Sequence, residues 1–157
     1  FAKRIKSFIQ IGAFPEYLLE HELELTPVDL CAEAIVQNLF YKSNCNVLHI
    51  YNTNLCPIKL FFKVIQDLNI KLLPVSNDTM SNIVTNILED NQKKEIMSGI
   101  IYDLDNNKQL IYTSNISLNS NFSNRYLLKI GFNWKKINKN YLKRCLKYFK
   151  QIDFINF

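Results

Sequence analysis

The amino-acid sequence predicts an α/β fold that is predominantly helical, with a few short strands. Apolar residues recur at helical spacing in most segments of the 157-residue chain, and two short apolar runs, 47–51 and 70–75, have the length of strands. Only three glycines occur, whereas eleven Phe and eight Tyr supply bulky core side chains. Apolar residues make up 48% of the chain, which excludes a disordered or collagen-like protein. We therefore expect an ordered domain, or an ordered piece of a larger one.

The first helix is expected at the N-terminus, where Phe1, Ile5, Phe8 and Ile9 have helical spacing. No capping residue precedes this helix, so we expect the chain to be cut from a longer polypeptide. Residues 12–15, with the sequence Gly-Ala-Phe-Pro, are expected to form a turn or loop because Gly and Pro interrupt regular structure.

The clearest helix start in the sequence is at Thr26. Thr26 is expected at the N-cap, Pro27 at the first helical position and Asp29 at the third, as in a capping box. Replacing Thr26 by Ala is then expected to cost about 1 kcal/mol. The apolar residues that follow form a broad face, which predicts packing against something large: Leu30, Cys31, Ala34, Ile35, Val36 and Leu39.

The two apolar runs are expected to be strands. Val47 to Tyr51 is nearly continuous in apolar residues, as in a buried parallel strand, so His49 is expected to be a buried, hydrogen-bonded residue, with a ligand contact as the alternative. In the run 70–75, Pro74 restricts the strand to an edge.

Further helices are expected in the remaining segments. From Ser76 onward the pattern is helical, with Asn77 or Asp78 as candidate caps. Gly131 is expected to close another helix in the left-handed conformation. The expected helical ranges are 57–68, from 76 onward, 92–104, 121–129 and 139–151.

No catalytic residue can be assigned from the sequence. A glycine-rich turn between a strand and a helix is missing, and no tyrosine has a lysine four positions later, as a short-chain reductase requires. The four cysteines lack the spacing of a zinc or redox site, so we expect no metal and free thiols in a reducing cytoplasm: Cys31, Cys45, Cys56 and Cys145. No apolar run is long enough for a membrane span, so a soluble protein is expected.

The last expected helix carries a row of lysines opposite its apolar side: Lys139, Lys143, Lys147 and Lys150. A solvated face is the default interpretation, and docking of an acidic protein is the main alternative. Nucleic acid is not expected, because no nucleic-acid motif accompanies the row. Trp134 is expected in the core, with a ligand platform as the alternative, and Asp29 is either a cap or a site residue.

Several motifs resemble one family in their order and spacing. They are residues 11–15 (Ile-Gly-Ala-Phe-Pro), 24–36 (Glu-Leu-Thr-Pro-Val-Asp-Leu-Cys-Ala-Glu-Ala-Ile-Val), 47–52 (Val-Leu-His-Ile-Tyr-Asn) and 127–134 (Leu-Leu-Lys-Ile-Gly-Phe-Asn-Trp). Together they resemble the C-terminal part of thioester reductase domains. These domains terminate nonribosomal peptide synthetases and belong to the extended short-chain dehydrogenase/reductase superfamily.

The resemblance implies the C-terminal substrate-binding subdomain of such a reductase, without its glycine-rich Rossmann half. In the family, that missing half binds NADPH and holds the catalytic residues. A peptidyl carrier protein delivers an acyl or peptidyl thioester on its phosphopantetheine arm, and the reductase converts the thioester to an aldehyde or alcohol. The fragment alone is therefore expected to be inactive and to hold no cofactor. Fatty acyl and carboxylic acid reductases are a neighbouring possibility.

The resemblance also implies site residues. Two groups of residues would border the cofactor and substrate cleft: Gly12, Phe14 and Pro15 in one, and Thr26, Val28 and Asp29 in the other. Residues 76–104 would form a helical cover over the substrate channel. The row of lysines, independently of the resemblance, predicts a docking face for a carrier protein at Lys139, Lys143 and Lys147. The alternative is a non-catalytic interaction module that binds an acidic carrier protein or another acidic partner through the basic C-terminal helix.

Overall fold

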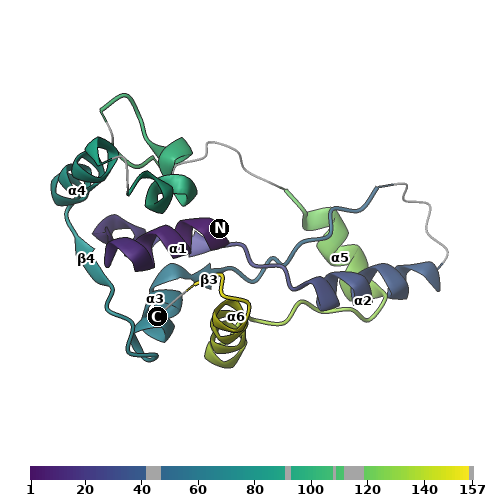
Figure 1. The fold of residues 1–157 in the computed structure, drawn as a ribbon. Helices are drawn as coiled ribbons and strands as arrows, with labels where there is room; N and C mark the ends of the chain where they lie inside the picture. The colour runs from purple at the N-terminus through teal and green to yellow at the C-terminus, as the bar shows by residue number, and fades with distance from the viewer. Residues whose placement is uncertain (42–46, 91–92, 108, 112–118, 156–157) are drawn as a thin grey trace. The chain divides into compact units, whose positions relative to one another are not determined.

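The computed structural model describes residues 1–41, 47–90, 93–107, 109–111 and 119–155 (Figure 1). The chain divides into two compact units. Unit 1 consists of Phe1–His21, Pro57–Thr113 and Lys139–Phe157, and unit 2 of Glu22–Cys56 and Ser114–Asn138. In the part of the chain that the structure describes, no helix has the length and apolar character needed to cross a bilayer.

Unit 1 is mostly helical and confirms the predicted helices at both ends of the chain. Its elements are α1 (Ala2–Ile11), β1 (Ala13–Pro15), the 3₁₀ helix η1 (Glu16–Glu20), α3 (Ile58–Gln66), β4 (Leu73–Val75), α4 (Asn77–Glu89), the 3₁₀ helices η2 (Lys94–Gly99) and η3 (Ile101–Asp103), and α6 (Lys139–Gln151). The last helix has the predicted bounds, while α3 ends two residues before the predicted range does.

The loop expected at residues 12–15 is wrong, because Ala13–Pro15 form strand β1. This strand pairs in parallel with β4, with Phe14 opposite Pro74. The strand expected at 70–75 is confirmed only over its last three residues. Each strand of this two-stranded sheet has one edge without a partner strand. Pro15 in β1 and Pro74 in β4 are therefore tolerated, although a proline cannot donate a backbone hydrogen bond.

Aromatic rings from three segments form the centre of unit 1. Phe14 of β1 stacks on Phe62 of α3 with 3.8 Å between ring centroids, and Phe8 of α1 meets Phe62 edge-on at 6.5 Å. Other fully buried members of this unit are Ile5, Leu18, Phe61, Ile65, Leu72, Met80, Met97 and Ile100. Burial of such large side chains is the main stabilising contribution to the unit.

The segment predicted as a helix over 92–104 forms two short 3₁₀ helices among its described residues. Gly99, a poor α-helix former, ends η2 where it approaches α1 closely. Its backbone N–H donates to the buried Ser7 hydroxyl at 3.2 Å. Nearby, Arg4 forms a bidentate ion pair with Asp103, with Nε–Oδ2 at 2.7 Å and Nη2–Oδ1 at 2.5 Å. These contacts fix η2 and η3 on α1.

The sequence predicted Asn77 or Asp78 as the cap of α4, but the helix is capped by Ser76. The Ser76 hydroxyl accepts a hydrogen bond from the backbone N–H of Thr79 at 3.3 Å. That amide is the third of the helix, which is the usual partner of an N-cap side chain.

Unit 2 is built around a small apolar cluster between two helices. Its elements are β2 (Glu22–Leu23), α2 (Val28–Leu39), β3 (Cys56–Pro57), whose last residue begins the next segment of unit 1, and α5 (Asn121–Lys129). Strand β2 pairs with β3. The cluster consists of Leu30, Ala34, Leu127, Ile130, Phe132 and Trp134. Trp134 is 5% exposed and meets Phe132 edge-on at 4.9 Å, which confirms its predicted core position.

The expected cap at Thr26 is wrong. Helix α2 begins at Val28, Pro27 is at the N-cap, and no side chain caps the helix. The Thr26 hydroxyl instead accepts a hydrogen bond from the backbone N–H of Asn52 at 2.8 Å and donates to Glu24 at 3.1 Å. Thr26 therefore fastens a distant segment of unit 2, an interaction that the local sequence does not show.

The strand expected at Val47 to Tyr51 does not form in the described part of the chain. His49 is exposed, so its expected burial is also wrong. The backbone N–H of His49 donates to the Ser123 hydroxyl at 2.9 Å, which holds this extended segment against α5. An apolar run becomes a strand only where another strand offers its backbone groups.

Helix α5 has the predicted bounds, and Gly131 follows it with φ of 91°. This left-handed conformation is what the sequence predicted for the residue that closes the helix. The turn returns the chain to the apolar cluster through the hydrogen bond from the Phe132 N–H to the Leu127 carbonyl, at 2.9 Å.

Candidate binding site

The lysine row of α6 forms a basic surface on unit 1. Lys139, at the start of α6, has its Nζ 3.9 Å from an Asp67 carboxylate oxygen, so part of its charge is compensated. Lys143 is half-buried, while Lys147 and Lys150 are exposed.

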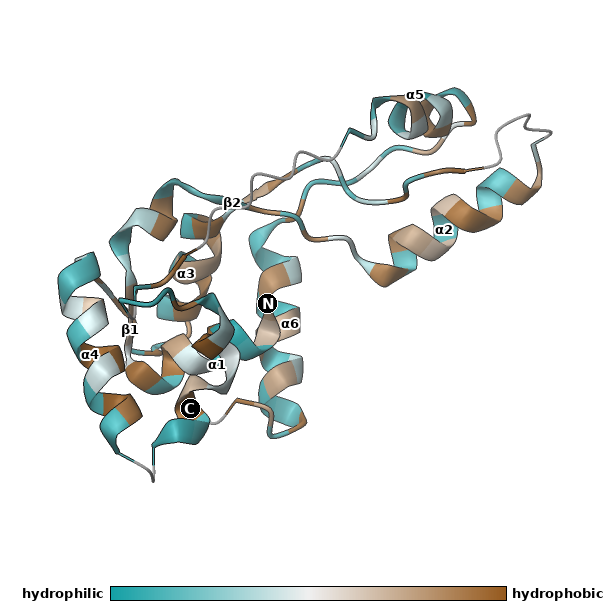
Figure 2. Cartoon of the chain, turned by 90° about the horizontal axis from the view of Figure 1, so that it is seen from above, coloured by the Kyte–Doolittle hydropathy of each residue, from teal (hydrophilic) through white to brown (hydrophobic). Residues whose placement is uncertain are grey.

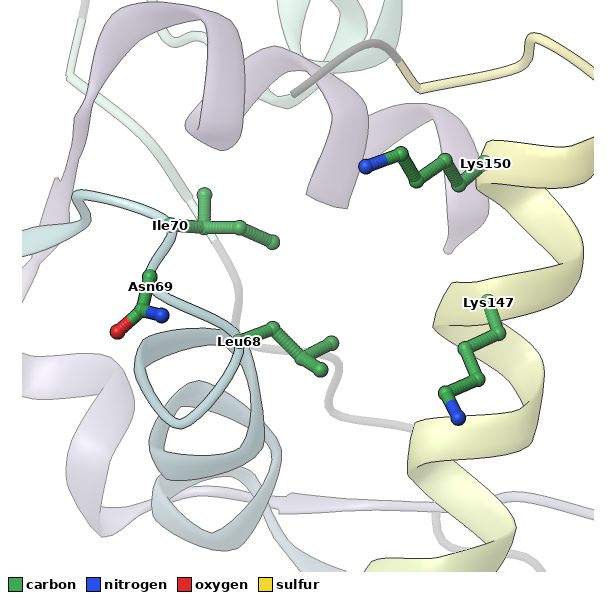
Figure 3. Close-up of a pocket in the computed structure, with 5 residues that line it drawn as sticks. All are labelled: Leu68, Asn69, Ile70, Lys147 and Lys150. Atoms are coloured by element: carbon green, nitrogen blue, oxygen red, sulfur yellow. The ribbon is translucent and has the colours of Figure 1, made fainter.

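Lys147 and Lys150 line a cavity of about 430 Å³ together with Leu68, Asn69 and Ile70 (Figure 3). Figure 3 shows the lysines on one side and the three residues that follow α3 on the other. Asn69 has φ of 60°, and this left-handed turn ends the helical segment before Ile70. A volume of this size is within the range of small-molecule sites.

The sequence predicted Lys139, Lys143 and Lys147 as a docking face, but it did not predict the cavity. Only Lys147 belongs to both sets, and Lys150 was noted only as part of the lysine row. Asn69 carried a weak signal, because Asn is the residue other than Gly that most readily adopts the left-handed conformation. The pairing of that turn with α6 is a tertiary feature.

Three of the residues predicted to border a cleft lie in unit 1, around strand β1. Gly12 ends α1 with φ of 76°. Phe14 is 1% exposed and stacks on Phe62, so its side chain belongs to the core. Pro15 is buried as well. Of this group, only the Gly12 end of the segment is partly accessible within its unit.

The other three lie in unit 2. The side chains of Val28 and Asp29 are exposed in the first turn of α2, and Thr26 is half-buried beside Asn52. Asn52 is completely buried, and its amide donates to the backbone carbonyls of Leu25 and Lys135, each at 3.1 Å. Placement of these residues at a cleft remains a prediction.

A second asparagine extends this network. The Asn54 side chain donates to the Trp134 carbonyl at 2.6 Å, and its backbone N–H donates to the Asn52 side-chain oxygen at 3.0 Å. The sequence pattern assigned no structural role to either asparagine, and Asn52 was named only as the last residue of the motif 47–52. The structure shows that they join residues 24–26, 52–54 and 134–135 by hydrogen bonds.

Tyr17 and Cys56 have shifted pKa values, and neither side chain is poised for catalysis at neutral pH. Burial, opposed by the Arg4 charge, raises the pKa of Tyr17 to about 12, and its hydroxyl donates to the Leu110 carbonyl at 2.9 Å. Burial, assisted by the Glu22 charge, raises the pKa of the Cys56 thiol. A neutral thiol is a poor nucleophile. Among the described residues, no three His, Cys, Asp or Glu side chains gather in a group that could hold a metal ion.

Helix α2 has a second apolar face, which unit 2 does not cover. We call it the exposed face of α2, and it consists of Val28, Ala32, Ile35, Val36 and Leu39. Val28 is 83% exposed and Leu39 75% exposed. Brown, hydrophobic stretches run along this helix in Figure 2. Aliphatic residues on two sides of one helix are typical of a helix that is buried on both.

Comparisons with known proteins show what this fold resembles. No protein-family model and no curated protein sequence matches the chain. Solved structures do match it: a thiolation-reductase di-domain from an archaeal non-ribosomal peptide synthetase has a TM-score of 0.77 at 16% identity. The terminal R domain of the myxalamid PKS-NRPS pathway has a TM-score of 0.70 at 13% identity, and the aureusimine biosynthetic cluster reductase domain 0.67 at 18%.

The match includes nearly all of this chain but a smaller share of the others. Each comparison covers 98% of this chain, yet only 31% of the di-domain chain and 38% of each of the other two. This is the relation expected of a C-terminal part, and it confirms, for the fold, the resemblance found in the sequence. The chain therefore has the fold of one part of the terminal reductase domains of nonribosomal peptide synthetases.

Proposed function

We propose that this chain is the substrate-binding part of a terminal thioester reductase. In full, such a domain would use NAD(P)H to reduce a peptidyl or acyl thioester held by a carrier protein, releasing an aldehyde or an alcohol. The single observation that carries this proposal is the structural match over 98% of the chain to three reductase domains. We place the domain in the cytoplasm, where its described cysteines would stay reduced as free thiols.

The exposed face of α2 supports a partner domain on the same polypeptide. The chain spans 31–38% of the length of the solved chains, so those structures contain much additional polypeptide. Apolar side chains as exposed as Val28 and Leu39 are stabilised when another surface covers them. We propose that the nucleotide-binding half of the reductase covers this face.

The residues of this chain do not form a nucleotide cradle by themselves. A dinucleotide site needs glycines between a strand and the N-terminus of a helix, where backbone can approach a pyrophosphate. Gly12 precedes a strand, Gly99 ends a 3₁₀ helix and Gly131 follows α5. The cofactor would therefore be bound mainly by residues outside this chain, and we derive no catalytic step within it.

The test is a reductase assay on two proteins. One is the complete polypeptide encoded by the reading frame that contains these residues, and the other is the 157-residue chain. Each receives a carrier protein loaded with an acyl-phosphopantetheine thioester, and NADPH consumption and aldehyde release are followed. We expect the complete polypeptide to reduce the thioester and the chain alone to be inactive. Lack of reduction by the complete polypeptide would overturn the proposal, and reduction by the chain alone would place the catalytic group within it.

A second candidate function is docking of an acidic carrier protein on the lysine row of α6. Exposed lysines on one helix attract an acidic surface, and one of the similar structures contains a thiolation domain in the same chain as its reductase. Replacing Lys143 and Lys147 by Glu should abolish carrier binding in a salt-sensitive way. A matched control replaces Lys71 and Lys94, which are exposed outside α6, with the same change of charge. Equal affinity of the two double variants would rule out the lysine row.

A further inference from the structure

Residues 47–51 have the composition of a buried strand but form no strand in the described part of the chain. The run is nearly continuous in apolar residues, as in strands of parallel sheets that are covered on both faces. From Val47 to Thr53 the chain forms no helix, turn or bend, and it lies beside α5 (Figure 1). The segment therefore has the sequence and the open backbone of a strand, without a sheet around it.

One edge of this segment is bonded to α5 and the other is open. In extended backbone, the N–H and C=O groups of alternate residues point to opposite edges. His49 points to α5, where its N–H donates to the Ser123 hydroxyl at 2.9 Å. In the part of the chain that the structure describes, no group bonds to the backbone N–H or C=O of Leu48 or Ile50. We call the backbone groups of Leu48 and Ile50 the open edge.

Contacts within unit 2 hold the open edge in place. The N–H of Asn52, two residues beyond Ile50, donates to the Thr26 hydroxyl at 2.8 Å, which ends the open edge. The Ile50 side chain packs against the apolar cluster of unit 2. Leu48 and Ile50 are both half-buried, and backbone polar groups that are withdrawn from water are stabilised by a hydrogen-bonding partner. The open edge is therefore a fixed surface that lacks its partner.

Helix α2 stands directly before this segment in the chain and presents a matching apolar surface. Two parallel strands need a crossover connection, which is usually a helix that packs on the face of the sheet. The exposed face of α2, with Val28 and Leu39 as its most exposed members, lies on the side of the helix that unit 2 does not cover. A sheet would supply what both elements lack: a flat face for α2 and a strand for the open edge.

We propose that residues 47–51 add as an edge strand to the parallel sheet of the nucleotide-binding half of the same polypeptide, with the exposed face of α2 packed on that sheet. Dinucleotide-binding halves are open, mostly parallel sheets with helices on both faces, so they offer both an edge and a face. The chain spans only 31–38% of the solved chains that it matches, so those chains are long enough to contain such a half. The inference rests on the proposed function for the existence of that half, but its tests need no reductase activity.

Hydrogen exchange, measured by mass spectrometry with residue-level fragmentation, compares the complete polypeptide with the 157-residue chain. We expect the amides of Leu48 and Ile50 to exchange at least about 100-fold more slowly in the complete polypeptide, because a paired strand exchanges only when its sheet opens. The His49 amide is the internal reference, since it is bonded to Ser123 without any partner half, and its rate should change less.

The exchange measurement separates this inference from the reductase function. Equal exchange of the Leu48 and Ile50 amides in the two proteins would overturn the edge strand, even if the complete polypeptide reduces a thioester. Slow exchange in a complete polypeptide that is inactive would support the edge strand, while the proposed function fails.

Two variants of Leu48 test the backbone pairing. Leu48→Pro removes the N–H of the open edge, whereas Leu48→Ala shortens the side chain and keeps the N–H. In the complete polypeptide, Leu48→Pro should abolish the slow exchange of the Ile50 amide and Leu48→Ala should retain most of it. Circular dichroism of each variant in the 157-residue chain confirms that the segment folds. Equal loss in the two variants would show that the N–H is not used for pairing.

Two variants of α2 test the helix face. Leu39→Gln places a polar side chain on the exposed face of α2, and Glu33→Gln is the matched control at an exposed position of the same helix outside that face. In the 157-residue chain both variants should leave Tm nearly unchanged, because both side chains are exposed there. In the complete polypeptide only Leu39→Gln should lower Tm, because an apolar contact is lost. Equal effects of the two variants in the complete polypeptide would overturn the packing of α2 on the sheet.

Discussion

Replacing Gly99 by Ala tests the close contact between η2 and α1. A Cβ atom at this position would overlap the Lys3 carbonyl group and lie 2.7 Å from the Arg4 backbone nitrogen. These are helix backbone atoms, so no flexible side chain can move aside. The two segments must separate, which costs 1–3 kcal/mol by analogy with overpacked cores, at about 2 kcal/mol on average. Separation also weakens the hydrogen bond from Gly99 to Ser7, which adds about 1 kcal/mol.

We therefore expect Gly99→Ala to lower the free energy of unfolding by about 3 kcal/mol, which corresponds to a decrease in Tm of ~6–12 °C for a chain of this size. The assay is urea unfolding followed by circular dichroism. Gly131→Ala is the matched control: nothing lies within 4 Å of its Cβ position, and only the positive φ of 91° is unfavourable, at a cost of about 1 kcal/mol. If Gly99→Ala costs no more than Gly131→Ala, the close contact is not as described and the reasoning fails.

Three further predictions concern single side chains. Burial raises the pKa of Tyr17 from 10.0 to about 12, so the contribution of its protonated hydroxyl to stability is complete below pH 10 and is lost as the pH rises from 10 to 12. Tyr17→Phe should therefore make the urea midpoint less sensitive to pH in that window. An unchanged sensitivity would refute this prediction. Asn52→Ala leaves buried backbone groups unpaired and should lower the free energy of unfolding by about 3 kcal/mol. Unfolding can be followed by the fluorescence of Trp134, the only tryptophan in the sequence. A decrease below about 1 kcal/mol would mean that water replaces the Asn52 side-chain amide. Ser76→Ala should cost about 1 kcal/mol through loss of the α4 cap, whereas Ser76→Asp should retain most of the stability; equal losses would show that the cap is not made.

The sequence alone determined those elements whose signals are local. Helices α5 and α6 have the bounds that apolar spacing predicted, because residues three and four apart share a face whatever lies beyond. The left-handed Gly131 was predictable for the same reason, since a helix end needs a residue without steric restriction. The overall helical character and the core position of Trp134 also followed from composition and pattern.

The tertiary structure decided the features that depend on contacts between residues far apart in the sequence. Ala13–Pro15 form a strand because β4 offers them backbone partners, whereas Val47 to Tyr51 form no strand in the described part of the chain. Thr26 does not cap α2 as predicted, because its hydroxyl accepts a hydrogen bond from the backbone N–H of Asn52.

In the candidate site, the cavity is the clearest example of a feature that the sequence could not predict. Its aliphatic side comes from the turn after α3 and its lysines from the end of α6. Periodicity assigns each residue to its own helix, but it contains no information about which helix ends meet. That meeting is fixed by the burial of apolar side chains from both segments in one core, and the cavity follows from it.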